Sequence, residues 1–327
     1  MNKPGVPAPG FVKRIGEIVD MRRGAEFREL NTRSLMNRLT GAAMPFGWTV
    51  NPFRGCEFGC RYCYARPTHE YLGHADPEDF EHRIYVKRAE GDRLIADLKR
   101  ARDSGQEIAI GAATDPYQPA ESRFEITRGV LEAIARVPRL RVGITTKSPA
   151  VTRDLELLQR IAAGSDLWVN FSVISLDADL LRLIEPRAPR PDLRLNALGA
   201  LARAGIRTRV FIMPVLPLIN DGETGLRALL GAARDAGAEE AISQPLFLRS
   251  ETTHHFFLEF IEREFPWALA RYREMFPAPG NAPRPYREAV ERLVERLARE
   301  AGFKARSREE RVQDEAPPRS RQLSLAW

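Results

Sequence analysis

The sequence contains very little cysteine, only three residues in 327. This odd, small number excludes a disulfide framework and indicates a reducing compartment. The chain also lacks any run of about 18 apolar residues, so no transmembrane helix is predicted. The proline-rich residues 1–10 contain no apolar segment of the kind found in secretory signals. We therefore expect a soluble cytoplasmic protein with no membrane partner.

The excess of basic residues is confined to the two ends of the chain. The net charge is +6; residues 1–40 carry eight Lys or Arg against four Asp or Glu, and residues 299–327 carry seven against five. The long middle part is balanced. Basic ends are typical either of contact with nucleic acid or of solvated tails, and the sequence leaves both open.

All three cysteines lie on one short stretch. Cys56, Cys60 and Cys63 have the spacing Cys-x3-Cys-x2-Cys, and Tyr62 precedes the last of them. Three thiolates on so short a loop can close on one metal centre, with Gly55 and Gly59 free to adopt positive φ around it. A [4Fe–4S] cluster usually takes four cysteines. Here one iron would lack a protein sulfur, and such an open position suits cofactor or substrate chemistry.

This motif resembles the cluster motif of the radical S-adenosylmethionine (radical SAM) superfamily. The resemblance implies a [4Fe–4S] cluster held by Cys56, Cys60 and Cys63, with S-adenosyl-L-methionine (SAM) on the remaining iron. An electron from the reduced cluster would cleave SAM, and the resulting 5′-deoxyadenosyl radical would remove a hydrogen atom from a substrate. The resemblance also implies an electron donor such as a flavodoxin or ferredoxin.

A structural zinc site is the alternative from a different class. His69 or His74 would then be the fourth ligand beside the three thiolates, in a zinc-stabilised nucleic-acid-binding protein. Structural zinc sites usually pair two short ligand spacings across a longer gap, and this chain has one short set only.

Strand and helix patterns alternate from residue 49 onward, in about six units of βαβ length, which implies a parallel sheet with helices outside. The resemblance implies an α/β fold, a partial (β/α)6 barrel, with an N-terminal extension over 1–45, a core domain over 46–250 and a C-terminal helical region with a polar tail over 251–327. The expected strands cover residues 49–53, 83–87, 107–111, 140–146, 167–174, 208–213 and 241–248. The expected helices cover residues 91–104, 124–137, 152–163, 176–184, 192–204, 223–236, 254–275 and 284–301.

Polar residues follow the predicted strands, where parallel α/β folds place their working groups. The chain contains, in this order, Cys60-Arg61-Tyr62-Cys63-Tyr64, Thr114-Asp115-Pro116, Thr146-Lys147-Ser148 and Phe171-Ser172. In these stretches it resembles the spore photoproduct lyase branch of the radical SAM enzymes. That resemblance implies that Tyr62 flanks adenine and that Thr114, Lys147 and Ser172 contact SAM, with Lys147 at its carboxylate. Met213 joins this cofactor-binding set, while Tyr64 and Asp115 face the substrate. Each of these assignments has a structural alternative. Thr114 and Asp115 would simply form a turn before Pro116, and the Ser172 hydroxyl would bond only to the backbone.

The chain departs from this branch at one point. The lyase returns a hydrogen atom to its product with help from a further cysteine near the Thr114 equivalent, where this chain has Gly111-Ala112-Ala113. DNA photoproduct repair by that relay is therefore doubtful, although it stays an alternative function.

Several other polar groups have two interpretations. Gln118 and Glu121 are expected to line the cavity of Asp115. The loop with Glu185, Arg187 and Arg190 either binds an anionic substrate or is salt-bridged within itself. His254 and His255 are candidate ligands or surface residues.

Overall fold

The structure is a computed structural model that describes residues 15–22, 24–39, 44–89 and 91–304. Its strands are β1 (Ile15–Arg22), β2 (Ala25–Asn31), β3 (Met36–Arg38), β4 (Trp48–Val50), β5 (Phe53–Arg54), β6 (Arg83–Arg88), β7 (Ile108–Ile110), β8 (Arg141–Thr146), β9 (Asp166–Ser172), β10 (Arg207–Val215), β11 (Glu240–Pro245), β12 (Phe247–Leu248) and β13 (Gly280–Asn281). Its helices are α1 (Asp79–His82), α2 (Gly91–Ser104), α3 (Glu121–Phe124), α4 (Ile126–Ala135), α5 (Leu155–Gly164), α6 (Ala178–Ile184), α7 (Pro191–Arg203), α8 (Glu223–Asp235), α9 (Glu251–Glu264), α10 (Leu269–Met275) and α11 (Arg284–Glu300), with 3-10 helices η2 (Arg66–Leu72), η3 (Pro149–Asp154) and η4 (Pro266–Ala268).

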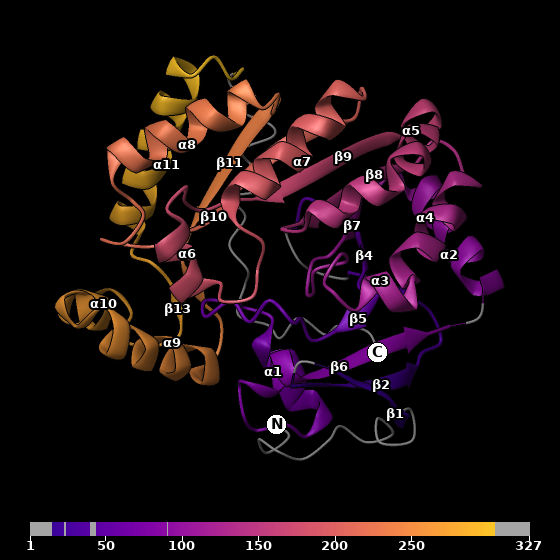
Figure 1. The fold of residues 1–327 in the computed structure, drawn as a ribbon, viewed down its shortest axis with the longest axis horizontal. Coiled ribbons are helices and arrows are strands. Elements are labelled where there is room, and N and C mark those ends of the chain that lie inside the picture. Colours follow the sequence, from indigo (N-terminus) through magenta and orange to yellow (C-terminus); the bar gives the residue numbers. More distant parts are fainter. Residues whose placement is uncertain (1–14, 23, 40–43, 90, 305–327) are drawn as a thin grey trace.

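The main sheet has seven strands in the order β11-β10-β9-β8-β7-β4-β3. All neighbours from β4 to β11 pair in parallel, and only the edge strand β3 is antiparallel. The helices that connect the parallel strands lie along the outside of their arc (Figure 1). This arrangement confirms the predicted partial barrel of six strand–helix units.

The two faces of the parallel strands carry different side chains. Val169 and Phe171 of β9 belong to the large apolar core beneath the helices. Because side chains alternate along a strand, Trp168, Asn170 and Ser172 point to the opposite, inner face. The polar groups of the sheet are thus gathered inside the arc.

Near the start of β9 and β10, two arginines stack on a tryptophan ring at the inner face of the sheet. The guanidinium carbons of Arg207 and Arg209 lie 3.7 and 3.5 Å from the centre of the Trp168 ring. Arg209 also pairs with Glu240 at 2.7 Å. These contacts stabilise the end of the sheet that lies away from the cysteine loop.

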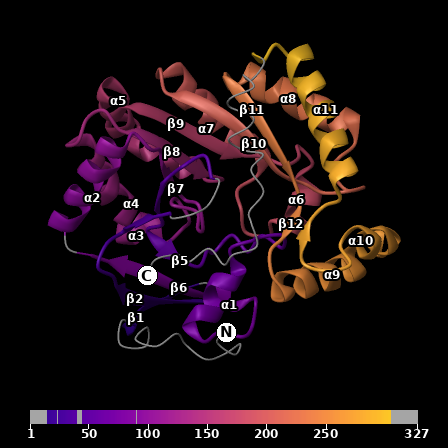
Figure 2. The same cartoon turned by 180° about the vertical axis from the view of Figure 1, so that it is seen from behind.

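A second sheet, in the order β1-β2-β6-β5, lies beside the first (Figure 2). The predicted strand at 83–87 exists as β6, but it pairs with β2 and β5 and not with the parallel strands. The sequence showed no firm period over the extension, yet residues 15–38 form three strands. In β1 five of the eight residues are exposed and none is buried, which removes the alternation that identifies a strand.

The C-terminal region is helical, with one correction. The single helix expected over 254–275 is two helices, α9 and α10, separated by η4. Pro266 begins this break, because proline lacks the N–H that would continue the helix. Helix α11 packs against α8 and β11. Within the described residues, no helix combines the length and apolar character that crossing a membrane requires.

Candidate functional site

The cysteine loop follows β5 at the carboxyl end of the parallel strands. Cys56 and Cys60 are buried, Cys63 is half-buried, and all three are free thiols. Gly55 and Gly59 have φ of 90° and 65°, as predicted. A Cβ on Gly55 would lie 2.8 Å from the Phe80 carbonyl oxygen, so the tight path of the loop requires glycine there.

The segment after β7 holds the front of this loop. The Thr114 hydroxyl donates to the Gly55 carbonyl oxygen at 2.6 Å. The Gln118 amide donates to the same oxygen at 3.2 Å and accepts from the Glu57 N–H at 2.9 Å. Thr114 and Gln118 therefore fix the backbone that carries Cys56.

The back of the loop is held by a buried arginine that sequence reasoning missed. The Arg66 side chain is fully buried and donates to the Cys60 carbonyl oxygen from Nε at 3.2 Å and from Nη2 at 2.9 Å. Its charge is balanced by Glu81 at 2.5 Å. Arg187 pairs with the same carboxylate at 3.2 Å, so the loop after α6 is salt-bridged to the Arg66–Glu81 pair.

A second buried charge network surrounds Tyr62. The Tyr62 hydroxyl donates to the Glu185 carboxylate. Glu185 also pairs with Arg194 at 2.5 Å and with Lys147 at 3.8 Å, and the Lys147 amine lies 5.7 Å from the Tyr62 ring centre. Burial alone would raise the pKa of Glu185, but Arg194 and Lys147 hold it below its ordinary value.

This network decides between the two interpretations of the loop at 185–190. Glu185 is fully buried and salt-bridged, and the exposed Arg190 pairs with Asp192 at 2.7 Å. Of the two interpretations, the structure supports the salt-bridged loop. A buried glutamate cannot be told from a surface one by local sequence pattern, which is why Glu185 and Arg194 were missed as a pair.

Asp115 connects the ends of two strands. Its carboxylate accepts from the Thr146 hydroxyl at 2.7 Å, from the Lys147 N–H at 2.7 Å and from the Tyr117 N–H at 2.9 Å. These three donors fix the backbone of Lys147 beside the cysteine loop. The geometry thus gives Asp115 a positioning role.

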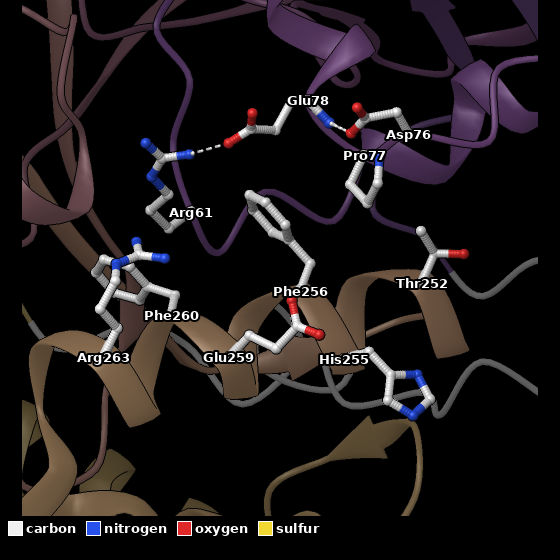
Figure 3. Close-up of a pocket in the computed structure, with 10 residues that line it drawn as sticks. All are labelled: Arg61, Asp76, Pro77, Glu78, Thr252, His255, Phe256, Glu259, Phe260 and Arg263. Atoms are coloured by element: carbon white, nitrogen blue, oxygen red, sulfur yellow. Dashed lines mark hydrogen bonds and ion pairs between the residues drawn. The ribbon is translucent and has the colours of Figure 1, made fainter.

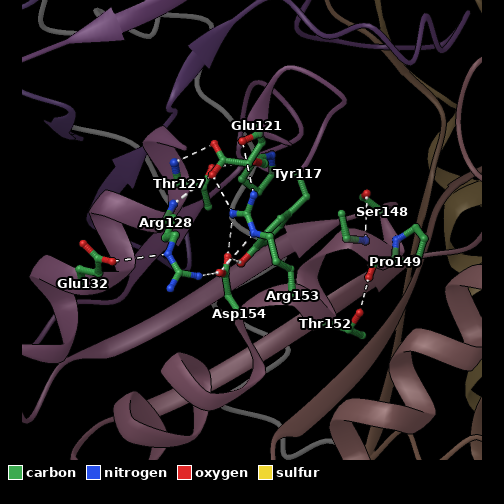
Figure 4. Close-up of polar contacts among 12 residues, drawn as sticks. Tyr117, Glu121, Thr127, Arg128, Glu132, Ser148, Pro149, Thr152, Arg153 and Asp154 are labelled. Carbon is green, nitrogen blue, oxygen red and sulfur yellow. Dashed lines mark hydrogen bonds and ion pairs between the residues drawn. The ribbon is translucent and has the colours of Figure 1, made fainter. Parts of the chain in front are cut away.

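Glu121 does not share the surroundings of Asp115, contrary to expectation. Its carboxylate accepts from the Arg128 N–H at 3.1 Å and pairs with Arg153 at 3.0 Å, at the start of α4. Figure 4 shows that Arg153 and Arg128 also reach Asp154, to which the Tyr117 hydroxyl donates at 3.1 Å. This network links α3, α4 and η3 to one another.

Unpartnered polar atoms remain on the inner face. The Ser172 hydroxyl and the Asn170 side-chain amide oxygen (Oδ1) are buried and have no hydrogen-bond partner among the described residues. Buried polar groups are nearly always paired, so these two atoms are suited to a bound ligand. The half-buried Met213 alternates with the core residue Ile212 on β10 and so faces the same side.

Tyr64 stands where the loop meets the solvent. Its side chain is 45% exposed, and its hydroxyl donates to the Ala112 carbonyl oxygen. Ala112 belongs to the stretch that lacks the lyase branch's additional cysteine. A place for Tyr64 on the substrate side stays a prediction, and the exposed side chain leaves it open to a substrate.

The three thiols do not form a compact group of single-ion ligands in this structure. Among the described residues, the only three Cys, His, Asp or Glu side chains with ligand atoms all within 4.8 Å of one another are Glu251, His254 and His255. At least two of the thiols are therefore further apart than the roughly 3.8 Å between sulfurs that tetrahedral zinc imposes. His69 and His74 instead bond to the Arg83 carbonyl oxygen and the Tyr85 hydroxyl.

Burial affects all three thiols in the same direction. It raises the pKa of Cys56 and Cys63, and it raises the pKa of Cys60 to about 12. Metal ligation requires thiolates, so iron would supply the positive charge that stabilises the deprotonated form here. Buried thiols, glycines that allow close approach and unpartnered oxygens nearby all fit an iron–sulfur cluster with a polar cofactor beside it.

Comparison with known proteins agrees with this geometry. The model of the radical SAM superfamily matches residues 50–228. The uncharacterized protein Rv2578c of Mycobacterium tuberculosis strain H37Rv is 35% identical over 291 residues, which cover 88% of this chain and 85% of that protein. The uncharacterized protein MJ0683 of Methanocaldococcus jannaschii is 29% identical over 176 residues, covering 54% and 63%.

Solved structures of spore photoproduct lyase share the fold. A complex of that enzyme with dinucleoside spore photoproduct superposes with a TM-score of 0.63 at 16% identity, covering 84% of this chain and 79% of the other. A variant with bound AdoMet and the same dinucleoside gives 0.61, also at 16% identity, covering 82% and 79%.

The fold and the cysteine loop define a radical SAM protein. The chain belongs to the radical SAM superfamily, whose members are enzymes that use SAM and an iron–sulfur cluster. Within it, the chain has the fold of spore photoproduct lyase.

Proposed function

We propose that this chain is a radical SAM enzyme with a [4Fe–4S] cluster on Cys56, Cys60 and Cys63. When bound, the cluster supplies the electron that cleaves SAM and yields the 5′-deoxyadenosyl radical for hydrogen abstraction. The carrying observation is that all three cysteines of the chain are gathered on one buried loop at the carboxyl end of the parallel strands. Because the chain has three cysteines for four irons, one iron would have no cysteine ligand and would be open to the cofactor.

The chain's own residues would bind and orient that cofactor. The Ser172 hydroxyl and the Asn170 amide oxygen have unused hydrogen-bonding capacity among the described residues. Lys147 is a half-buried cation beside the loop, and Cys60 and Glu185 raise its pKa although burial opposes this. A charged amine there would attract the SAM carboxylate. Tyr62 and Met213 would offer apolar contact to adenine.

The test is reductive cleavage of SAM. Protein reconstituted without oxygen with iron and sulfide, then given dithionite and SAM, should release methionine and 5′-deoxyadenosine. Cys60→Ala should abolish the product, and the reaction without dithionite is the control. If fully reconstituted and reduced protein leaves SAM intact, the proposal is wrong.

Photoproduct repair is a second candidate, supported by the shared fold with spore photoproduct lyase. One observation argues against the same repair mechanism. The stretch in which that branch has a further cysteine contains Ala112 here, and the Ala112 carbonyl oxygen accepts a hydrogen bond from Tyr64. For this second candidate we propose that nucleic acid is the substrate class and that a flavodoxin or ferredoxin donates the electron. Salt-dependent binding of labelled DNA would support the first point, and no binding at low salt would remove it.

A further inference from the structure

The first turn of α9 brings three metal-binding residue types together. One ligand atom from each of Glu251, His254 and His255 lies within 4.8 Å of the other two. The spacing explains this proximity, because residues three and four apart are neighbours on a helix surface. The group is separate from the cysteine loop and has no role in the function proposed above.

His254 provides an independent observation at this group. Its side chain is buried, with 7% exposed, and its Nε2 lies 2.8 Å from the Phe276 carbonyl oxygen. Nε2 must donate to a carbonyl, so the neutral ring has its lone pair on Nδ1. That Nδ1 is buried without a hydrogen-bond partner among the described residues. Metal-ligating histidines are held in the same way, with the other ring nitrogen donating to a backbone carbonyl.

His255 has the complementary arrangement. Its Nδ1 lies 2.9 Å from the Glu251 carbonyl oxygen, so Nδ1–H donates there and the lone pair is on Nε2. His255 and Glu251 are both exposed, which leaves the group open to an ion from solution. Two imidazoles with fixed tautomers and one carboxylate are thus presented on one turn.

The geometry points to a second metal site, for a divalent transition ion of the zinc type, bound by Glu251, His254 and His255. Imidazole and carboxylate ligands suit such an ion. Three protein ligands would leave a fourth position for water or for a group of a bound molecule. No thiol takes part, so this site is distinct in its donors from the cluster site.

A pocket lies on the side of α9 next to the proposed metal site. His255 also lines a pocket of about 390 Å³ whose opposite wall includes Arg61 of the cysteine loop and Glu78 (Figure 3). The Arg61 guanidinium lies 5.8 Å from the Phe256 ring centre. In Figure 3 the His255 ring points away from Arg61 and Glu78, so a metal on His255 would lie outside this pocket.

Titration of cluster-loaded protein with Zn²⁺, followed by calorimetry, tests the site. The wild type should bind one zinc ion in addition to the cluster iron. Glu251→Gln and His255→Ala should each weaken zinc binding by about tenfold or more, because each removes one of three ligands. Glu262→Gln, which removes a carboxylate about three turns after Glu251 along α9 that pairs with Arg273 at 3.5 Å, is the matched control and should bind like the wild type.

Cobalt distinguishes this site from the thiols. Co²⁺ bound by nitrogen and oxygen should give only weak visible absorption, whereas Co²⁺ on a cysteine gives intense sulfur-to-metal bands. Equal zinc binding by the wild type, Glu251→Gln and His255→Ala would overturn the proposal, and so would zinc binding that shows the thiolate spectrum. Neither result bears on SAM cleavage, which is measured separately.

Discussion

The Thr114 hydroxyl donates a hydrogen bond to the Gly55 carbonyl oxygen at 2.6 Å, directly before Cys56. Sequence resemblance assigned Thr114 to the cofactor, whereas this contact commits its proton to the cysteine loop. The hydroxyl oxygen accepts in turn from the Gln118 amide at 3.0 Å. Thr114 therefore acts on the cofactor site through the loop that it holds.

Thr114→Val should destabilise the protein by about 1–3 kcal/mol, because it leaves the buried Gly55 carbonyl with a weaker set of donors. We also expect less iron per chain after reconstitution. Thr114→Ser keeps the hydroxyl and is the matched control. Iron content and thermal unfolding measure the effect. Normal iron content and stability with weakened SAM binding would instead assign Thr114 to direct cofactor contact.

Ser172→Ala should weaken SAM binding by about tenfold without loss of stability in the absence of SAM. The Ser172 hydroxyl is buried without a partner among the described residues, so its removal breaks no internal hydrogen bond. Equilibrium dialysis with SAM and thermal unfolding provide the two readouts. Ser122→Ala, which removes an exposed hydroxyl, is the control. Unchanged SAM affinity in Ser172→Ala would exclude Ser172 from the binding site.

Glu185→Gln should destabilise the protein by about 3 kcal/mol or more, because Arg194 would be left buried without its counter-charge. Thermal and denaturant unfolding measure this loss. The exposed pair of Arg190 and Asp192 supplies the comparison, and Asp192→Asn should have no measurable effect. A similarly small effect of Glu185→Gln would show that water reaches this network.

Lys87 should make stability rise with pH above neutrality. Burial, with a contribution from Arg54, lowers the pKa of Lys87 to about 7. Between pH 7 and the ordinary lysine pKa of about 10.4, the unfolded chain holds a proton that the folded chain lacks. Stability therefore increases with pH across this window, and the full penalty is present below it.

Lys87→Met should remove that pH dependence and raise the free energy of unfolding at pH 7, by on the order of 2 kcal/mol. Lys99→Met, which removes an exposed lysine on α2, is the control and should leave the slope unchanged. Denaturant unfolding from pH 6.5 to 10 measures both. An identical pH slope in the wild type and Lys87→Met would contradict the assignment to Lys87.

The sequence was sufficient for the parts of the fold that repeat. Strands such as β8 and β9 are apolar runs between helices of regular period, so local pattern locates them. Strand β6 was located as well, but its partner was not, because pairing with β2 is a contact across more than 50 residues that no local pattern encodes. Proline within the predicted helix at 254–275 was given too little weight, and η4 begins there.

The candidate site divides in the same way. The cysteines were found by spacing alone, and the structure gathers them on one loop. Arg66, Glu185 and Arg194 were not found, because charged residues are usually exposed and a sequence does not reveal which few are buried against each other. Their part in holding the cysteine loop and the Tyr62 network follows only from the contacts in the folded structure.

The pairing of β2 with β6 ties residues 25–31 to residues 83–88, and the cysteine loop lies between these two segments in the chain. Phe80, whose carbonyl receives the Cys56 N–H at 2.9 Å, stands just before β6. Separation of these two strands would loosen the loop while the six parallel strands stayed paired. A shortened chain without β2 should accordingly lose its iron faster than the full chain, which iron content measured over time would show.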